Sequence, residues 1–216
     1  MDKFLWLAVC YLLGSIPSGF LVSRYSGKDI LNIGWRKTSG SNVFKNVGKL
    51  QGVITAVMDI GKGYIAVWGA QKLGLSSEIQ VVSGVVALIG NNWSLFLNFA
   101  GGRGIGLYGG SVLAMSPPIF VFCLITIIVL GIIWDASIGT ITLLTLAVFL
   151  SVRFGLFSTV GVLTLLSLIP IFLKRLSPIK ELSFEKKRLF INRLIFDDDQ
   201  PKDFRIKRIT KRLTEK

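Results

Sequence analysis

The feature that most limits the fold of this chain is a series of apolar stretches, each near the length of a lipid-spanning helix. About 20 helical residues cross the hydrocarbon core of a bilayer. The mean hydropathy of +0.63 is typical of membrane proteins. Five stretches qualify, one of them rather short: residues 4–23, 53–71, 79–97, 137–151 and 156–173. We therefore expect an all-α, polytopic integral membrane protein.

Region 104–134 decides how many times the chain crosses the membrane. As a single helix it would hold Pro117 and Pro118 in its interior, where proline removes helical hydrogen bonds. As two helices it gives 104–116 and 118–134. The first has 13 residues and spans only about 20 Å, so it must begin in a protein-lined or water-filled recess.

Lysine and arginine favour the cytoplasmic side of a membrane. Segment 24–50 carries six of them against Asp29, and the tail after Leu173 carries fourteen. If both segments are cytoplasmic, the N-terminus lies outside and the number of crossings is odd. We therefore predict seven transmembrane helices, one of them short. Residues 1–173 form the membrane domain, and residues 174–216 form a basic cytoplasmic tail. Its amphipathic part, "FEKKRLFINRLIF", is expected to lie on the inner leaflet.

The composition excludes several classes of function. The chain has no histidine, which rules out a Ser-His-Asp triad or imidazole–metal chemistry. Cys10 and Cys123 lie inside apolar stretches without ligand spacing, so we interpret them as packing residues and expect no metal site. The net charge of +13 is confined to loops and the tail, which fits an anionic lipid leaflet rather than nucleic acid.

The sequence "FAGGRGIG" has the features of a phosphate-binding loop. Gly101, Gly102 and Gly104 flank Arg103, and a predicted helix starts directly after them. Glycine lets backbone N–H groups approach an anion, and a helix N-terminus favours negative charge. The guanidinium adds a two-pronged contact to phosphate. Taken alone, the fragment favours the alternative of a short turn with one basic residue, because short glycine motifs are weak signals.

The loop "GWRKTSGSN", residues 34–42, repeats this chemistry on the same face. It holds both neutral hydrogen-bonding groups and cations: Ser39, Ser41 and Asn42, and Arg36, Lys37 and the nearby Lys45. Taken alone, the loop favours the alternative of solvated surface.

Two further positions carry polar groups inside apolar stretches. Asp59 and Lys62 are three residues apart and share one helical face, where an intramembrane ion pair is either functional or pins two helices together. Ser137 opens the element "SIGT", and its hydroxyl could instead bridge helix backbones. The polar elements thus gather at the predicted cytoplasmic face, unlike a transporter, which places them at the midplane.

Taken in order, these pieces resemble the bacterial acyl-phosphate-dependent glycerol-3-phosphate acyltransferases. The shared elements run from Gly14 to about Asp199: "GSIPSG", "GKDI", "SGSNV", "MDIGKG", "GN", "FAGGRG" and "ASIGTI". The resemblance matches five residues to family positions. It implies that Ser41, Asn42 and Ser137 are catalytic, together with Arg103 and Lys45, and that Ser15 and Arg188 bind substrate. Arg103 stands where the family usually has lysine, and Lys45 where it usually has arginine.

The chain also departs from that family. Trp35, Arg36 and Lys37 replace Ser, Gly and Asn of the usual loop. In the C-terminal pattern, the usual histidine is Lys187 and the usual asparagine is Phe190. We expect Arg36 and Lys37 to take over phosphate-holding work from these lost groups.

The resemblance implies transfer of an acyl group from acyl phosphate to the 1-hydroxyl of glycerol 3-phosphate, giving lysophosphatidic acid for phospholipid biosynthesis. It implies no cofactor and no metal. Arg103 with its glycine loop would hold one phosphate, and Lys45 with Arg36 would hold the other. The hydroxyl proton would go to a substrate phosphate oxygen or to a carboxylate, for which Asp59 is the candidate. We expect a monomer in the bacterial inner membrane, with membrane lipids as partners and a cytoplasmic active face. The alternatives are a non-catalytic lipid- or anion-binding protein of the same fold, or a small-anion transporter.

Overall fold

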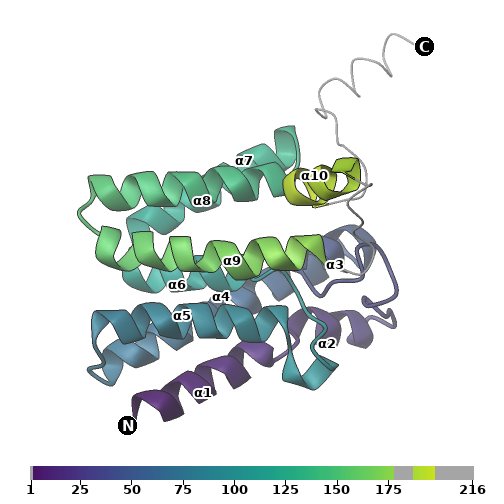
Figure 1. Ribbon diagram of the computed structural model, residues 1–216. Coiled ribbons are helices and arrows are strands. Elements are labelled where there is room, and N and C mark those ends of the chain that lie inside the picture. Colours follow the sequence, from purple (N-terminus) through teal and green to yellow (C-terminus); the bar gives the residue numbers. More distant parts are fainter. Residues whose placement is uncertain (1, 178–186, 198–216) are drawn as a thin grey trace.

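The computed structural model describes residues 2–177 and 187–197, and within these ranges the chain forms helices and no strand. Figure 1 shows the long helices stacked side by side with roughly aligned axes. The expected all-α fold is confirmed for this part of the chain. Most of the predicted basic tail, at 178–186 and 198–216, lies outside the described residues, as does the side chain of Lys187.

The apolar stretches form the long helices. The α-helices are α1 (Lys3–Ser15), α2 (Ser18–Tyr25), α3 (Gly40–Asn46), α4 (Lys49–Lys72), α5 (Ser77–Asn92), α6 (Ile105–Met115), α7 (Pro117–Ile133), α8 (Ala136–Arg153), α9 (Val162–Leu176) and α10 (Lys187–Phe196). A 3-10 helix, η1 (Leu95–Leu97), and a π-helical turn, η2 (Phe157–Gly161), lie between them. Five helical segments are long and apolar enough to cross a membrane: Lys3–Tyr25, Lys49–Lys72, Ser77–Leu97, Ala136–Arg153 and Phe157–Leu176. The shorter apolar helices are α6 and α7.

Proline marks two helix boundaries. Pro17 lies between α1 and α2, and Ser116 ends α6 directly before Pro117, the first residue of α7. A proline is tolerated at the start of a helix because its missing N–H would have no helical partner there. The predicted division of region 104–134 into two helices is confirmed, and α6, with 11 residues, is short as expected.

Glycine allows the backbones of neighbouring helices to touch. A Cβ atom on Gly63 of α4 would lie 1.9 Å from the carbonyl oxygen of Leu107 on α6, and one on Gly110 would lie 1.9 Å from that of Ile60. Gly14 meets the backbone of α5 at Ala87 in the same way. In lipid the hydrophobic effect does not drive helices together. Small residues at such contacts allow the close van der Waals packing that holds the helices together instead.

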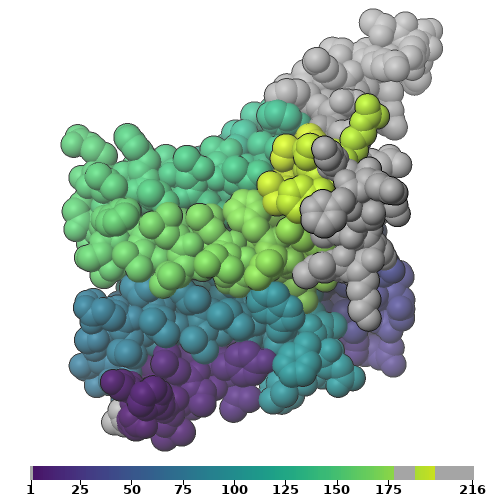
Figure 2. All heavy atoms as spheres, viewed as in Figure 1, coloured from purple at the N-terminus to yellow at the C-terminus, as the bar shows by residue number. Residues whose placement is uncertain are grey.

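The polar elements lie at one end of the bundle. In Figure 1, α2, α3 and α10 lie at one end and the N-terminus lies at the other. Figure 2 shows α10 seated beside α8 and α9. Two hydrogen bonds hold it there: Ser137 Oγ donates to the Phe196 carbonyl at 2.8 Å, and Arg175 Nη1 donates to the Leu194 carbonyl at 2.7 Å.

Candidate active site

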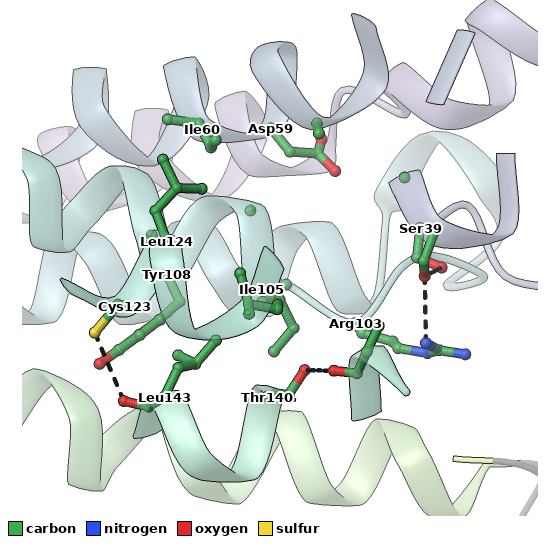
Figure 3. Close-up of a pocket in the computed structure, with 18 of the residues that line it drawn as sticks. Ser39, Asp59, Ile60, Arg103, Ile105, Tyr108, Cys123, Leu124, Thr140 and Leu143 are labelled. Carbon is green, nitrogen blue, oxygen red and sulfur yellow. Dashed lines mark hydrogen bonds between the residues drawn. The ribbon is translucent and has the colours of Figure 1, made fainter. Parts of the chain in front are cut away.

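A cavity of about 220 Å³ lies between α4, α6, α7 and α8. Its interior is apolar and includes Ile105, Tyr108, Phe120, Cys123, Leu124 and Leu143. Ser39, Ser41 and Arg103 line it as well, and Figure 3 shows Ser39 and Arg103 at one end with Cys123 and Leu143 at the other. The arrangement can hold an apolar chain with a polar or anionic group at one end.

The glycine loop places Arg103 at this polar end. Gly104 takes a left-handed φ of 77° and directly precedes α6, a conformation that favours glycine. The loop is anchored by Gly102 N, which donates to the Asn91 carbonyl at 3.0 Å, and by Gly101 O, which accepts from Thr38 N at 3.3 Å. This Gly102 N–H therefore serves the fold, which leaves the guanidinium as the candidate anion-binding group at this place.

Arg103 is buried and only partly satisfied. Its Nη1 donates to Ser41 Oγ at 3.4 Å, and its Cζ lies 5.0 Å from the centroid of the Trp35 ring. Its Nη2 is buried and has no hydrogen-bond partner among the described residues. A buried donor without a partner is costly, so this nitrogen is available to an incoming anion.

Lys45 approaches the same aromatic ring as Arg103. Its Nζ lies 5.0 Å from the Trp35 centroid, within the range of a cation–π contact. Trp35 therefore brings together two cations that the sequence analysis predicts to hold the two substrate phosphates. Arg36, by contrast, is exposed and has a left-handed φ of 54°.

Asn42 is fully buried, and its side-chain amide organises the loop. Its Nδ2 donates to the carbonyls of Lys37 at 2.8 Å and Ile33 at 3.3 Å. Its Oδ1 accepts from Trp35 N at 3.2 Å and from Asn46 Nδ2 at 2.7 Å. These bonds use the amide fully, and they shape the loop that presents Trp35, Lys37 and Ser41.

Lys37 and Arg103 share a partner that the sequence analysis missed, Asp197 at the end of α10. Lys37 Nζ lies 3.2 Å from Asp197 Oδ1, and Arg103 Nε contacts Oδ2. Burial lowers the pKa of the Lys37 ammonium, and the Asp197 carboxylate partly offsets this by raising it. The only sequence signal was the position of Asp197, four residues after Arg193 and first in a run of three aspartates within a basic tail.

Three more buried cations surround this group: Lys174, Arg175 and Arg193. Arg175 donates through Nη2 to the Ser137 carbonyl at 3.0 Å, and Lys174 donates to the Phe99 carbonyl at 3.5 Å. Both belong to the last turn of α9, where sequence reasoning placed only the start of a surface tail. They face inward because α10 covers this end of α8 and α9.

The intramembrane pair of Asp59 and Lys62 is well satisfied. Lys62 Nζ lies 2.8 Å from Asp59 Oδ1 and donates to the Ile16 carbonyl at 2.7 Å, at the break between α1 and α2. Ser18 Oγ also donates to the Asp59 carboxylate. These contacts pin the α1–α2 break to α4, and Asp59 additionally lines the cavity.

Three other predicted residues lie outside the cavity lining. Ser15 Oγ donates to the Gly90 carbonyl at 3.3 Å, which joins α1 to α5. Ser137 lies at the first turn of α8 and holds the end of α10. Arg188 is exposed on α10.

Comparison with known proteins points to one family. A sequence profile described as "Glycerol-3-phosphate acyltransferase" matches residues 4–184. A protein of that name from Synechococcus sp. (strain CC9902) is 37% identical over 125 residues, covering 57% of this chain and 62% of its own. One from Moorella thermoacetica, numbered 2, is 36% identical over 150 residues, covering 68% of this chain and 77% of its own. The alignments with the Synechococcus relative and one from Parasynechococcus marenigrum span 62% and 58% of those relatives.

Solved structures of the same kind are similar throughout the fold. A crystal structure of PlsY, described as an integral membrane glycerol 3-phosphate acyltransferase in its glycerol 3-phosphate form, matches with a TM-score of 0.71 and 26% identity. It covers 85% of this chain and 96% of its own. The lysophosphatidic acid form of PlsY matches with a TM-score of 0.69. With a profile match over most of its length, this chain belongs to the glycerol-3-phosphate acyltransferase family.

Proposed function

We propose that this chain transfers a fatty acyl group from acyl phosphate to the 1-hydroxyl of glycerol 3-phosphate, giving lysophosphatidic acid. The observation that carries the proposal is the meeting of an apolar cavity with buried cations at its polar end. An acyl chain fits the apolar part, and a phosphate fits beside Arg103, whose Nη2 has no hydrogen-bond partner among the described residues. The PlsY forms with glycerol 3-phosphate and lysophosphatidic acid support the same substrate and product.

The chemistry needs positioning more than a protein nucleophile. The glycerol 1-hydroxyl oxygen bonds to the acyl carbon, the bond from that carbon to the phosphate oxygen breaks, and the hydroxyl proton goes to a phosphate oxygen. Holding both substrates together supplies much of the rate. Arg103 and Lys45 stabilise negative charge on the carbonyl oxygen and the leaving phosphate. Asn42 and Ser137 act by positioning the loop and α10, while Ser41 holds the Arg103 guanidinium.

The site would face the cytoplasm in a seven-crossing topology. Five long apolar segments and the two shorter helices α6 and α7 support seven crossings. The basic loop 24–50 and the polar end of the bundle support an N-terminus outside and a C-terminus inside. The protein would act as a monomer in a bacterial inner membrane.

Cysteine labelling tests this orientation. Leu73 and Tyr25 are exposed at opposite ends of the bundle, and the two native cysteines are buried. We expect a membrane-impermeant maleimide to label Leu73→Cys in intact cells and Tyr25→Cys only after lysis. Labelling of Tyr25→Cys in intact cells would show that the protein has the opposite orientation.

A direct assay tests the activity. The purified full-length chain in detergent micelles is given palmitoyl phosphate and radiolabelled glycerol 3-phosphate, and lysophosphatidic acid is measured. We expect product that depends on both substrates and no product when palmitoyl-CoA replaces the acyl phosphate. Binding of glycerol 3-phosphate without product would favour the non-catalytic alternative, and its flux into proteoliposomes would favour the transporter.

A further inference from the structure

Asp197 occupies a place where the proposed function needs a substrate anion. Its carboxylate lies between the Lys37 ammonium, at 3.2 Å, and the Arg103 guanidinium. Its side chain is 1% exposed, and those of Lys37 and Arg103 are 11% and 10% exposed. The ammonium group of lysine and the guanidinium group of arginine both bind phosphate well. The carboxylate therefore fills a site whose chemistry suits a phosphate.

The end of α10 places a local cost on a carboxylate. Asp197 follows the last residue of α10 and has a left-handed φ of 51°, a conformation that glycine adopts most readily and that aspartate tolerates. A carboxylate at a helix C-terminus also meets the negative end of the helix dipole. Its backbone N–H donates to the Arg193 carbonyl at 3.0 Å, so it remains tied to the helix. The ion pairs with Lys37 and Arg103 are what offset these local costs.

Among the residues that the structure describes, buried cations outnumber carboxylates around Asp197. Four of these cations are Lys37, Arg103, Lys174 and Arg175. Lys37 and Arg175 each interact electrostatically with Asp197 and with Arg103, Lys174 interacts with Lys37, and the half-buried Asp135 adds a negative charge near Arg175. Buried like charges need a counter-charge. A phosphate monoester carries nearly two negative charges near pH 7, so it neutralises the cluster better than one carboxylate.

We propose that Asp197 is an internal counter-anion, which competes with the substrate phosphate for the Lys37–Arg103 site and so sets the affinity for that substrate. The inference rests on the proposed function in taking the ligand to be a phosphate monoester or acyl phosphate. Phosphate and carboxylate repel each other and require the same donors, so phosphate entry expels Asp197. The last turn of α10 moves with it, because the Asp197 amide is bonded to that turn.

The test measures glycerol 3-phosphate and dodecyl phosphate binding to the full chain in detergent by isothermal titration calorimetry. Asp197→Asn is expected to bind at least one of these two ligands at least tenfold more tightly than the wild type. The ligand whose affinity increases shows which substrate's phosphate occupies the Lys37–Arg103 site. Asp197→Gly, which suits the left-handed backbone, should show the same gain and guards against misfolding of the first variant. Asp197→Glu keeps the charge and should stay nearer to the wild type. Asp29→Asn, the same substitution in the loop after α2, is the matched control and should change neither affinity.

Hydrogen exchange of residues 187–196 provides a second measurement. In the wild type, saturating ligand should speed exchange in α10, and in Asp197→Asn that exchange should already be fast without ligand. Unchanged or weaker binding in both Asp197→Asn and Asp197→Gly would overturn the inference, as would lost turnover with unchanged binding, since Asp197 would then serve the reaction itself. Tighter binding in a chain that forms no lysophosphatidic acid would uphold the inference while the proposed function fails.

Discussion

Arg103→Ala is expected to lower acyl transfer at least a hundredfold while leaving the protein folded in the membrane. The substitution removes the guanidinium at the polar end of the cavity, including the buried Nη2 without a partner among the described residues. A charged hydrogen bond contributes about 1.5–3 kcal/mol, and a hundredfold loss of rate corresponds to about 2.7 kcal/mol. The measurement is the initial rate of lysophosphatidic acid formation at saturating substrates.

Two further variants serve as controls for the loss of activity in Arg103→Ala. Arg103→Lys keeps the charge and loses the two-pronged geometry, so it should retain intermediate activity. Arg153→Ala removes an exposed arginine at the other end of α8 and should behave as the wild type. The assignment is wrong if Arg103→Ala keeps activity within twofold of the wild type, or if Arg153→Ala loses as much activity as Arg103→Ala.

Gly63→Ala is expected to destabilise the protein strongly, whereas Gly61→Ala, two residues away on α4, should stabilise it. The new Cβ atom at position 63 would lie 1.9 Å from the Leu107 carbonyl oxygen, so α4 and α6 would have to separate. Overpacking of this kind costs about 1–3 kcal/mol, and the rigid backbone on the other side favours the upper end. At position 61, apart from its chain neighbours and the backbone of its own helix, no atom lies within 4 Å of the added carbon.

The expected gain at position 61 comes from helix propensity. Alanine is favoured over glycine in a helix interior by up to about 1 kcal/mol. The apparent unfolding temperature in detergent, followed by intrinsic tryptophan fluorescence, measures both variants. Because α4 and α6 both line the cavity, Gly63→Ala should also reduce acyl transfer. Equal melting temperatures for the two variants would show that the α4–α6 contact is looser than the structure has it.

The sequence predicted most of the secondary structure because lipid imposes local rules. An apolar segment in a bilayer must satisfy its own backbone hydrogen bonds, so composition alone indicates a helix. Proline likewise acts locally, which is why the division of region 104–134 at Ser116 could be predicted. The glycine loop around Arg103 also follows from nearby residues, since Gly104 supplies a left-handed turn at the start of α6.

The tertiary structure decided which polar groups meet and what each of them binds. Lys37 and Asp197 are 160 positions apart, and no local pattern pairs them. The charge pattern suggested a surface role for Lys174 and Arg175, but α10 packs over the end of α9 and buries both. The resemblance predicts Asn42 as a catalytic residue, and the structure adds that its amide is hydrogen-bonded within its own loop. Helices and their breaks depend on neighbours in sequence, whereas a buried ion pair depends on charges that only the packed bundle brings together.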